Sequence, residues 1–354
     1  MGKILLTGNE ACGEGAIRAG CRFYAGYPIT PQNELTAYMS RRMDEEKGIF
    51  IQSESEVAAI NMIFGAALTG ARAMTTSSSP GISLMQEGIS YMAGCQLPAV
   101  IVNIMRGGPG LGNIAPSQSD YFQATKGGGH GDYNMVVLAP ASVQEMFDLT
   151  YEAFDIADRY RNPVMVLSDG IIGQMMEPLE AILEARTGGD ADKNWTLTGC
   201  LNREPRSIRS LFLGDRELEG WNERLQEKYR KMEKREVRVE KYRTGQNDLV
   251  IVAYGTCARI ARAVCDDLRK KGYRAGLVRP ISLWPFPYAA LRDLDKRNRR
   301  KADYLVVEMS AGQMLHDVRL AVGDDKRAHF HGRMGGGVPD QEEVAKLAER
   351  ILKG

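Results

Sequence analysis

Gly26-Tyr27-Pro28-Ile29-Thr30-Pro31 is the most informative stretch of this chain. It follows a short apolar run of the kind that forms a strand, and Thr30 places a hydroxyl just beyond the expected strand end. Glu56 and Arg106 also follow short apolar runs in this way. The carboxyl ends of strands in an open α/β sheet are where ligands bind. Thr30, Glu56 and Arg106 therefore predict a ligand site at one edge of a sheet.

Two blocks of the chain alternate apolar runs with longer segments of helical period, which is typical of parallel sheets covered by helices. The first block predicts strands at residues 3–7, 23–26, 49–53, 73–76, 97–105, 135–138 and 163–167. The second block is smaller. We therefore predict an α/β protein with a first domain over residues 1–185, a charged connector over 186–246 and a second α/β domain over 247–354.

The connector contains a segment, residues 215–241, that is dense in Arg, Lys and Glu. Its apolar residues recur every three or four positions, which predicts an exposed helix with a narrow apolar stripe. A solvated linker helix and a surface covered by another subunit are both compatible with this pattern.

The charge balance indicates which partners the chain lacks. Its 46 basic and 45 acidic residues give a formal net charge of +1, so no overall field attracts nucleic acid or an anionic membrane. The apolar run over residues 97–105 is far shorter than the roughly 20 residues of a membrane-spanning helix, and the first residues are too short an apolar run for a signal peptide. We expect a soluble, cytoplasmic protein that binds neither nucleic acid nor membrane.

Several common site chemistries are missing from the sequence. The six cysteines form no Cys-x-x-Cys pair, which argues against a structural zinc and against an iron–sulfur cluster held by this chain alone. The four histidines show neither zinc-ligand nor Ser/His/Asp spacing, and the dinucleotide and Walker A fingerprints are absent. We predict no metal site, and any electron carriers must lie in other chains.

Glu56 has the sharpest chemical interpretation. A protonated carboxyl group at the mouth of a strand–helix unit can donate a hydrogen bond to a ring nitrogen. Thiamine diphosphate needs such a bond at N1′ of its aminopyrimidine, where it promotes the imino tautomer. The alternative is that Glu54 and Glu56 only complement the dipole of the following helix, which is worth about 0.3–1 kcal/mol.

Four motifs, in this order, resemble the 2-oxoacid:ferredoxin oxidoreductases. They are Gly26-Tyr27-Pro28-Ile29-Thr30-Pro31; Glu56-Val57-Ala58-Ala59 with Gly65-Ala66; Arg106-Gly107-Gly108-Pro109; and Arg279-Pro280-Ile281-Ser282-Leu283-Trp284-Pro285-Phe286-Pro287. The resemblance covers nearly the whole chain and looks closest to the branched-chain 2-oxoacid enzymes, which act on 2-oxoisovalerate (3-methyl-2-oxobutanoate). It implies a pyrimidine-binding thiamine diphosphate domain followed by a domain like the C-terminal one of transketolase.

The resemblance also implies roles for individual residues. Glu56 would bind the aminopyrimidine, and Thr30 and Arg106 would bind the carboxylate and carbonyl of the 2-oxoacid. Tyr27, Pro28 and Ile29 would lie beside the cofactor. A guanidinium can grip a carboxylate with two parallel hydrogen bonds, so Arg106 suits this task. The alternatives are a solvated charge for Arg106 and a turn or helix-cap hydroxyl for Thr30.

One family motif is absent. Thiamine diphosphate enzymes hold the pyrophosphate through a divalent metal on a Gly-Asp-Gly motif, and the chain contains no such tripeptide. The chain can therefore hold only half of the cofactor. We expect a pyrophosphate-binding partner subunit that carries Mg, a gamma-type subunit, a ferredoxin-like subunit with the iron–sulfur clusters, and no activity from this chain alone.

The implied reaction is the oxidative decarboxylation of a 2-oxoacid, with electrons passing to ferredoxin and the acyl group to coenzyme A. Residues 110–120 contain no cation that could pair with a second substrate carboxylate, which favours an apolar substrate such as 2-oxoisovalerate. A partner subunit could supply that cation, so a 2-oxoglutarate enzyme is the alternative. A second alternative is a non-catalytic scaffold that docks through the charged helix at 215–241.

Overall fold

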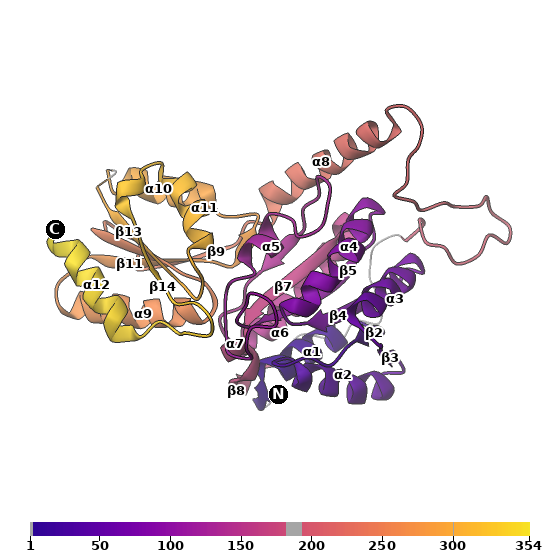
Figure 1. Cartoon of the computed structure of the whole chain (residues 1–354), viewed down its shortest axis with the longest axis horizontal. Helices are drawn as coiled ribbons and strands as arrows, with labels where there is room; N and C mark the ends of the chain where they lie inside the picture. The colour runs from indigo at the N-terminus through magenta and orange to yellow at the C-terminus, as the bar shows by residue number, and fades with distance from the viewer. Residues whose placement is uncertain (1–2, 182–192, 300) are drawn as a thin grey trace.

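The chain folds into two α/β lobes that lie side by side (Figure 1). In this computed structural model, residues 3–181, 193–299 and 301–354 are described. Each lobe has a mostly parallel sheet flanked by helices, so the predicted fold class is confirmed. The boundary predicted between residues 185 and 186 lies outside the described residues.

The first lobe contains the following elements: β1 (Ile4–Thr7), α1 (Gly8–Arg18), β2 (Phe23–Gly26), α2 (Asn33–Glu45), β3 (Ile49–Gln52), α3 (Glu56–Leu68), β4 (Ala73–Ser77), α4 (Pro80–Gly94), β5 (Ala99–Met105), α5 (Tyr121–Thr125), β6 (Val136–Leu138), α6 (Val143–Tyr160), β7 (Pro163–Asp169), α7 (Gly170–Gln174) and β8 (Met176–Leu179).

The rest of the chain contains these elements: α8 (Glu217–Arg235), β9 (Val239–Tyr242), β10 (Leu249–Val252), α9 (Gly255–Lys270), β11 (Ala275–Pro280), β12 (Ser282–Trp284), α10 (Tyr288–Arg297), β13 (Asp303–Glu308), α11 (Gln313–Val322), η1 (Asp325–Arg327), β14 (Ala328–Gly332) and α12 (Gln341–Lys353).

The sheet of the first lobe has the order β12-β6-β7-β5-β4-β2-β3, and its strands from β2 to β7 run parallel. Right-handed crossovers put α3 and α4 on one face and α2 and α6 on the other. Consistent with this, α3 packs against α4, while α1 packs against α2 and α6. Every residue of β5 and β7 is buried, so the core lies along these two strands. The carboxyl ends of the parallel strands share one edge.

Two strands take places that the sequence pattern did not predict. β1 lies outside the large sheet and pairs antiparallel with β8. β12, although it follows the second block of strands, joins the first sheet antiparallel to β6, where Ala139 N donates to Ile281 O at 2.7 Å. Without it, β6 would be an edge strand with unpaired backbone groups, which sheets rarely leave uncovered.

The second sheet has the order β14-β13-β10-β11-β9, and only β9 is antiparallel to its neighbour. β9 falls within the residues expected to form the connector, and β12 joins the other lobe. The chain therefore crosses between the lobes more than once, because each sheet recruits an edge strand from outside its own block.

The predicted charged helix corresponds to α8, which lies above the first lobe in Figure 1 and leads toward the second lobe. Its stripe residues Leu225, Tyr229 and Met232 are buried within the chain's own core, and the ring of Tyr229 meets that of Trp284 edge to face at 6.4 Å. Leu218, at the far end, is exposed. Most of the stripe is covered by this chain, so it offers little surface to a scaffold partner.

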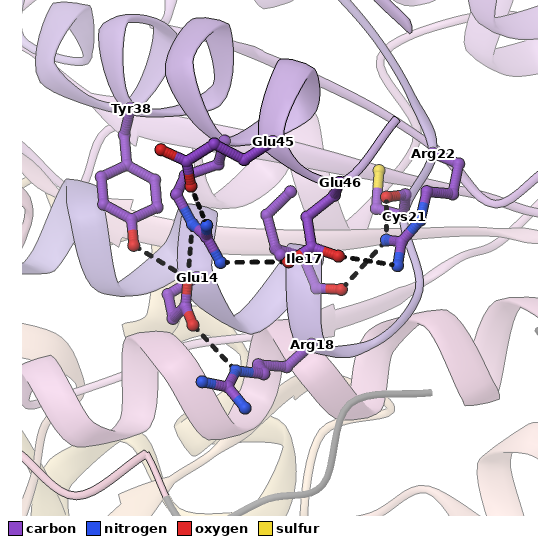
Figure 2. Close-up of polar contacts among 9 residues, drawn as sticks. Glu14, Ile17, Arg18, Cys21, Arg22, Tyr38, Glu45 and Glu46 are labelled. Carbon is purple, nitrogen blue, oxygen red and sulfur yellow. Dashed lines mark hydrogen bonds and ion pairs between the residues drawn. The ribbon is translucent and has the colours of Figure 1, made fainter. Parts of the chain in front are cut away.

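Polar contacts between α1 and α2 fix the helix that follows the Thr30-Pro31 turn. The buried carboxylate of Glu14 on α1 accepts a hydrogen bond from Tyr38 on α2 at 2.8 Å, and Arg18, one turn along α1, donates to its other oxygen at 2.8 Å (Figure 2). Nearer the turn, Asn9 Nδ2 donates to Pro31 O at 2.9 Å. These contacts thus fix the position of the start of α2 relative to the carboxyl edge of the sheet.

Candidate functional site

Polar residues collect where β2, β4 and β5 end. These three strands are neighbours in the sheet and run parallel, so the segments that follow them meet at one edge. Thr30 follows β2, Ser79 follows β4 and Arg106 follows β5. Glu56 opens α3 and reaches Ser77 at the end of β4. The structure therefore brings the three residues predicted from sequence to the same edge.

Arg106 is buried, and its guanidinium is held by backbone carbonyls rather than by carboxylates. Nη1 donates to Thr30 O at 3.0 Å, and Nη2 donates to Leu111 O at 3.2 Å. Nε is also buried and has no hydrogen-bond partner among the described residues. The guanidinium is thus enclosed and bonded to backbone carbonyls, with Nε–H as a donor that no described residue uses, which is incompatible with the alternative of a solvated surface charge.

Thr30 lies beside Arg106 but uses different atoms. Its carbonyl oxygen receives the Arg106 hydrogen bond, while its hydroxyl accepts from Asn33 Nδ2 at 3.3 Å. Because the hydroxyl acts as an acceptor there, its own hydrogen remains available to a ligand. Tyr27 and Pro28 are exposed and Ile29 is half-buried, so the motif residues predicted to flank the cofactor line an open surface.

The turn between Tyr27 and Thr30 is supported from below by Gln32. Gln32 Nε2 donates to Tyr27 O at 3.2 Å, and its Oε1 accepts from Thr76 Oγ1 at 2.7 Å. The hydroxyls of Thr76 and Tyr24 are 2.7 Å apart. This network is almost completely buried, which fixes the backbone on which Thr30 stands.

Glu56 is the first residue of α3 and is buried. Ser55 caps the helix by accepting from Ala58 N at 3.2 Å, so the position of Glu56 follows from a normal helix start. Ser77 Oγ, at 3.4 Å, is the one hydrogen-bond partner of its carboxylate among the described residues. A carboxylate that only served the helix dipole would be expected in solvent, whereas this one is enclosed with unused hydrogen-bonding capacity.

Ser79 is a site residue that the sequence analysis missed. Its hydroxyl accepts from Arg106 N at 3.0 Å and donates to Asp120 Oδ2 at 2.6 Å, and burial raises the pKa of the Asp120 carboxyl. Its backbone has a φ of 23°, which non-glycine residues adopt rarely and at a cost of about 1–3 kcal/mol. The available signal was the run Ser77-Ser78-Ser79-Pro80, a polar cluster between a strand and a helix-initiating proline.

The site presents two kinds of unused polar groups. Arg106 Nε and Ser78 Oγ are buried without a partner among the described residues, and the Glu56 carboxylate has only its long contact to Ser77. A heterocycle with a ring nitrogen near Glu56 and an anion near Arg106 would satisfy them. The fold and the site thus define a class, α/β proteins that bind a heterocyclic cofactor and an anionic substrate at a sheet edge.

Two family models match the chain. The family described as pyruvate flavodoxin/ferredoxin oxidoreductase, thiamine diP-bdg, matches residues 14–243, and pyruvate:ferredoxin oxidoreductase core domain II matches residues 247–344. The chain belongs to the thiamine diphosphate-dependent 2-oxoacid:ferredoxin oxidoreductase family, which confirms the resemblance read from the motifs.

Named relatives include two kinds of subunit. The ketoisovalerate oxidoreductase subunit VorB of Methanothermobacter thermautotrophicus is 49% identical over 354 residues, covering 99% of this chain and 98% of that protein. The 2-oxoglutarate synthase subunit KorA of Archaeoglobus fulgidus is 44% identical over 326 residues, covering 89% of this chain and 90% of that protein.

Solved structures agree with the fold. The 2-oxoglutarate:ferredoxin oxidoreductase from Magnetococcus marinus, with 2-oxoglutarate, coenzyme A and succinyl-CoA bound, superposes with a TM-score of 0.85 at 25% identity. That match covers 99% of this chain, which spans only 65% of the Magnetococcus chain. A split-gene transketolase shares the fold with a TM-score of 0.59 at 13% identity, over 98% of both chains.

The described residues contain neither a cluster of potential metal ligands nor a membrane-spanning helix. No cluster of three or more histidine, cysteine, aspartate or glutamate side chains suited to a metal occurs within residues 3–181, 193–299 and 301–354. No helix in those ranges is both long enough and apolar enough to cross a membrane.

Proposed function

We propose that this chain is the pyrimidine-binding subunit of a coenzyme A-acylating enzyme that oxidatively decarboxylates a branched-chain 2-oxoacid and passes the electrons to ferredoxin. The observation that carries the proposal is the buried Glu56 carboxylate, which shares one sheet edge with the buried Arg106 guanidinium. The family and the relatives named above support the same reaction class.

Glu56 is proposed to hold the cofactor ring. Bound thiamine diphosphate supplies the carbon nucleophile and the electron sink that decarboxylation requires. The contribution of this chain is a carboxyl group, enclosed at the first turn of α3, that shares a proton with a ring nitrogen. Gly81 lies so close that a β-carbon on it would be 2.4 Å from Glu56 Oε1, so the present position of the carboxyl group requires a glycine at this point of α4.

Arg106 and Thr30 are proposed to orient the 2-oxoacid. The two backbone carbonyls that hold the guanidinium leave its Nε–H as a buried donor with no partner in the described part of the chain. A substrate carboxylate placed there would gain a charge-assisted hydrogen bond, and the Thr30 hydroxyl could donate a second one. Orientation of the carboxylate before the bond to the carbonyl carbon breaks is the role we assign to this pair.

The other half of the cofactor is proposed to lie on a pyrophosphate-binding partner that carries Mg. The chain lacks a Gly-Asp-Gly motif, and the helices next to the site expose apolar side chains, which suits a covered surface. Val57 and Met62 on α3 and Leu84 and Tyr91 on α4 are the exposed residues. A gamma-type subunit and a ferredoxin-like iron–sulfur subunit complete the proposed complex, with ferredoxin and coenzyme A as its reaction partners.

The substrate is proposed to be 2-oxoisovalerate. The segment after Arg106, residues 107–120, contains no lysine or arginine, and its tip exposes Leu111 and Ile114. An apolar substrate side chain suits such surroundings better than a second carboxylate. The VorB relative supports this choice, whereas the KorA relative supports 2-oxoglutarate as the alternative.

Glu56→Gln in the reconstituted complex tests the catalytic role. Loss of a general acid–base group should lower decarboxylation by ~10²–10⁴-fold. Glu54→Gln is the matched control, because Glu54 lies two residues earlier, is exposed and loses the same charge. If the activity of Glu56→Gln stays within about threefold of the parent's, the loss is far smaller than removal of an acid–base group should cause. That result would favour the scaffold alternative.

Parallel turnover of 2-oxoisovalerate, 2-oxoglutarate, pyruvate and aromatic 2-oxoacids by the native complex tests the substrate. Reduction of ferredoxin or a viologen dye is the readout, with nicotinamide and lipoamide as alternative acceptors. We expect the fastest turnover with 2-oxoisovalerate and none from the isolated chain. Equal or faster turnover of 2-oxoglutarate would overturn the substrate assignment.

A further inference from the structure

We propose that the second lobe clamps the segment that carries Arg106, and that Gln118 is the positioning residue of this clamp. The segment, residues 106–120, is called the substrate loop below. This inference rests on the proposed role of Arg106 in binding the 2-oxoacid. It assigns to the second lobe a part in substrate binding, although the site residues named above all belong to the first lobe.

The substrate loop is tied to the first lobe at both ends. At its start, Arg106 N donates to Ser79 Oγ at 3.0 Å. At its end, the carboxylate of Asp120 accepts from Ser79 Oγ at 2.6 Å and from Asn103 Nδ2 at 2.9 Å. The two ends thus meet at one serine, and the path of the loop between them must be fixed by other contacts.

Gln118 supplies the main contacts to the second lobe. Its side-chain Nε2 donates to Tyr254 O at 2.9 Å, and its Oε1 accepts from Met309 N at 3.0 Å. Its backbone N donates to Met309 O at 2.9 Å, and its carbonyl accepts from Tyr254 OH at 3.2 Å. All three residues are buried. Gln118 is therefore bonded to the residues that follow two neighbouring second-lobe strands, β10 and β13.

Further contacts hold the loop on either side of Gln118. Asn113 Nδ2 donates to Gly335 O at 2.8 Å, and Gln313 Nε2 donates to Ser119 O at 2.7 Å. A β-carbon on Gly336 would lie 2.5 Å from that of Ala115, so the glycine-rich turn of the second lobe fits tightly against the loop. The second lobe therefore contacts the loop along its length and not at one point.

The path of the loop sets the orientation of the Arg106 guanidinium. Nη2 donates to Leu111 O, which lies inside the loop, so a change in the loop moves one of the two carbonyls that hold the side chain. Ordering a flexible segment on substrate binding weakens that binding, and a loop ordered in advance avoids the loss. The clamp therefore acts on substrate affinity through Arg106.

Gln118→Ala and Gln118→Glu, assayed in the reconstituted complex, test the clamp. Gln118→Ala removes both side-chain bonds, whereas Gln118→Glu keeps the acceptor for Met309 N and loses the donor to Tyr254 O. We expect the KM for the 2-oxoacid to rise about tenfold in Gln118→Ala, the size expected for loss of two buried hydrogen bonds. The kcat and the half-saturating thiamine diphosphate concentration should change by less than about threefold, since neither depends on those bonds.

The matched control is Gln226→Ala. Gln226 Nε2 also donates to a backbone carbonyl, Asp132 O at 2.7 Å, but this bond is exposed and lies outside the substrate loop. Its loss should leave the KM unchanged. If Gln118→Ala does not assemble, Gln118→Glu carries the test, and an unchanged KM in the assembled variant overturns the clamp.

A double-mutant cycle with Arg106→Lys separates positioning from general damage. If Gln118 acts through Arg106, Gln118→Ala should raise the KM little or not at all when Arg106 is already replaced. Increases that multiply would overturn the clamp. If Arg106→Lys alone leaves the KM unchanged, the substrate role of Arg106 fails and the clamp fails with it. If Arg106→Lys raises the KM and neither Gln118 variant does, only the clamp fails.

Discussion

At the scale of single residues, backbone carbonyls and a serine hydroxyl hold the two charged side chains of the site, Arg106 and Glu56. An ion pair in their place would neutralise the groups that are needed to bind a ligand. Arg106 is held by two carbonyls, so its positive charge is not cancelled by a carboxylate. Glu56 touches a serine hydroxyl and not a cation. Both side chains are therefore buried but still able to pair with a ligand, a combination that is costly without one.

Lys228 on α8 should make the stability of the folded protein depend on pH. Burial, reinforced by the nearby charge of Arg161, lowers its pKa from 10.5 to about 7. Below pH 7 the folded protein holds a charged ammonium group at this half-buried position. Between about pH 7 and 10.5 the unfolded chain binds one more proton than the folded chain, so stability should rise with pH.

Lys228→Met removes this proton linkage. We expect the variant to melt at a higher temperature than the parent at about pH 6, with the advantage shrinking as the pH rises toward 10. Thermal unfolding across that range is the measurement. Lys231→Met, one turn nearby and exposed, is the control and should track the parent. A parent and a Lys228→Met variant with parallel pH profiles would contradict the assignment.

At the scale of elements, the start of α4 is packed against Glu56. A β-carbon at Gly81 would lie 2.0 Å from Ser77 Oγ and 2.4 Å from Glu56 Oε1, and both atoms are at the ends of side chains that can rotate. Gly81→Ala should therefore displace the Glu56 carboxylate while the helix persists. We expect activity to fall by about tenfold or more, approaching the loss expected for Glu56→Gln.

Gly94→Ala, at the other end of α4, is the matched control for Gly81→Ala. A β-carbon there meets only Ser210 Cβ, at an ordinary contact distance of 3.5 Å. Alanine should be neutral or stabilise the helix by up to about 1 kcal/mol, with unchanged turnover. Steady-state turnover and circular dichroism of both variants distinguish the outcomes. Full activity in Gly81→Ala would mean that catalysis does not depend on the exact position of the Glu56 carboxylate.

The same scale shows what the sequence could predict. Apolar runs and turns located β2, β4, β5 and β7, because those signals are local, and with them the positions of Glu56 and Arg106. Local patterns carry no information on pairing between distant segments. The pairing of β12 with β6 and of β1 with β8, the hydroxyl of Ser79 between Arg106 and Asp120, and the contacts of Gln118 all join residues far apart in the chain, so they appeared only in the structure.

At the scale of the whole molecule, buried polar contacts join the two lobes. Asp169, at the end of β7, accepts from Thr256 N at 2.9 Å and from Thr256 Oγ1 at 2.6 Å, which places a carboxylate at the amino end of α9. Burial raises the pKa of this carboxyl group. Together with Gln118, this contact links the carboxyl edges of both sheets, so the lobes are expected to move as one body near the site.

Arg279, on β11 of the second lobe, forms a second polar contact with the first lobe. Its guanidinium donates to both oxygens of Glu145 on α6, at 2.8 and 2.6 Å, and Nε donates to Glu240 on β9 at 2.7 Å. Breaking a buried ion pair by removing one partner costs roughly 3–5 kcal/mol. The carboxylates here are partly exposed, and Glu240 also pairs with Arg262, so we expect Arg279→Met to cost about 2 kcal/mol.

Loss of Arg279 should also make the two lobes unfold less cooperatively with each other. Since the pair spans the interface, Arg279→Met should lower the melting temperature by roughly 2–4 °C and broaden or split the calorimetric transition. Arg274→Met is the control, because Arg274 makes a similar two-pronged pair with Asp248 within the second lobe, but that pair is exposed. Its loss should cost less than about 1 kcal/mol and leave a single sharp transition. Equal effects from the two variants would mean that the Arg279 contact does not couple the lobes, and that Gln118 and Asp169 hold them together without it.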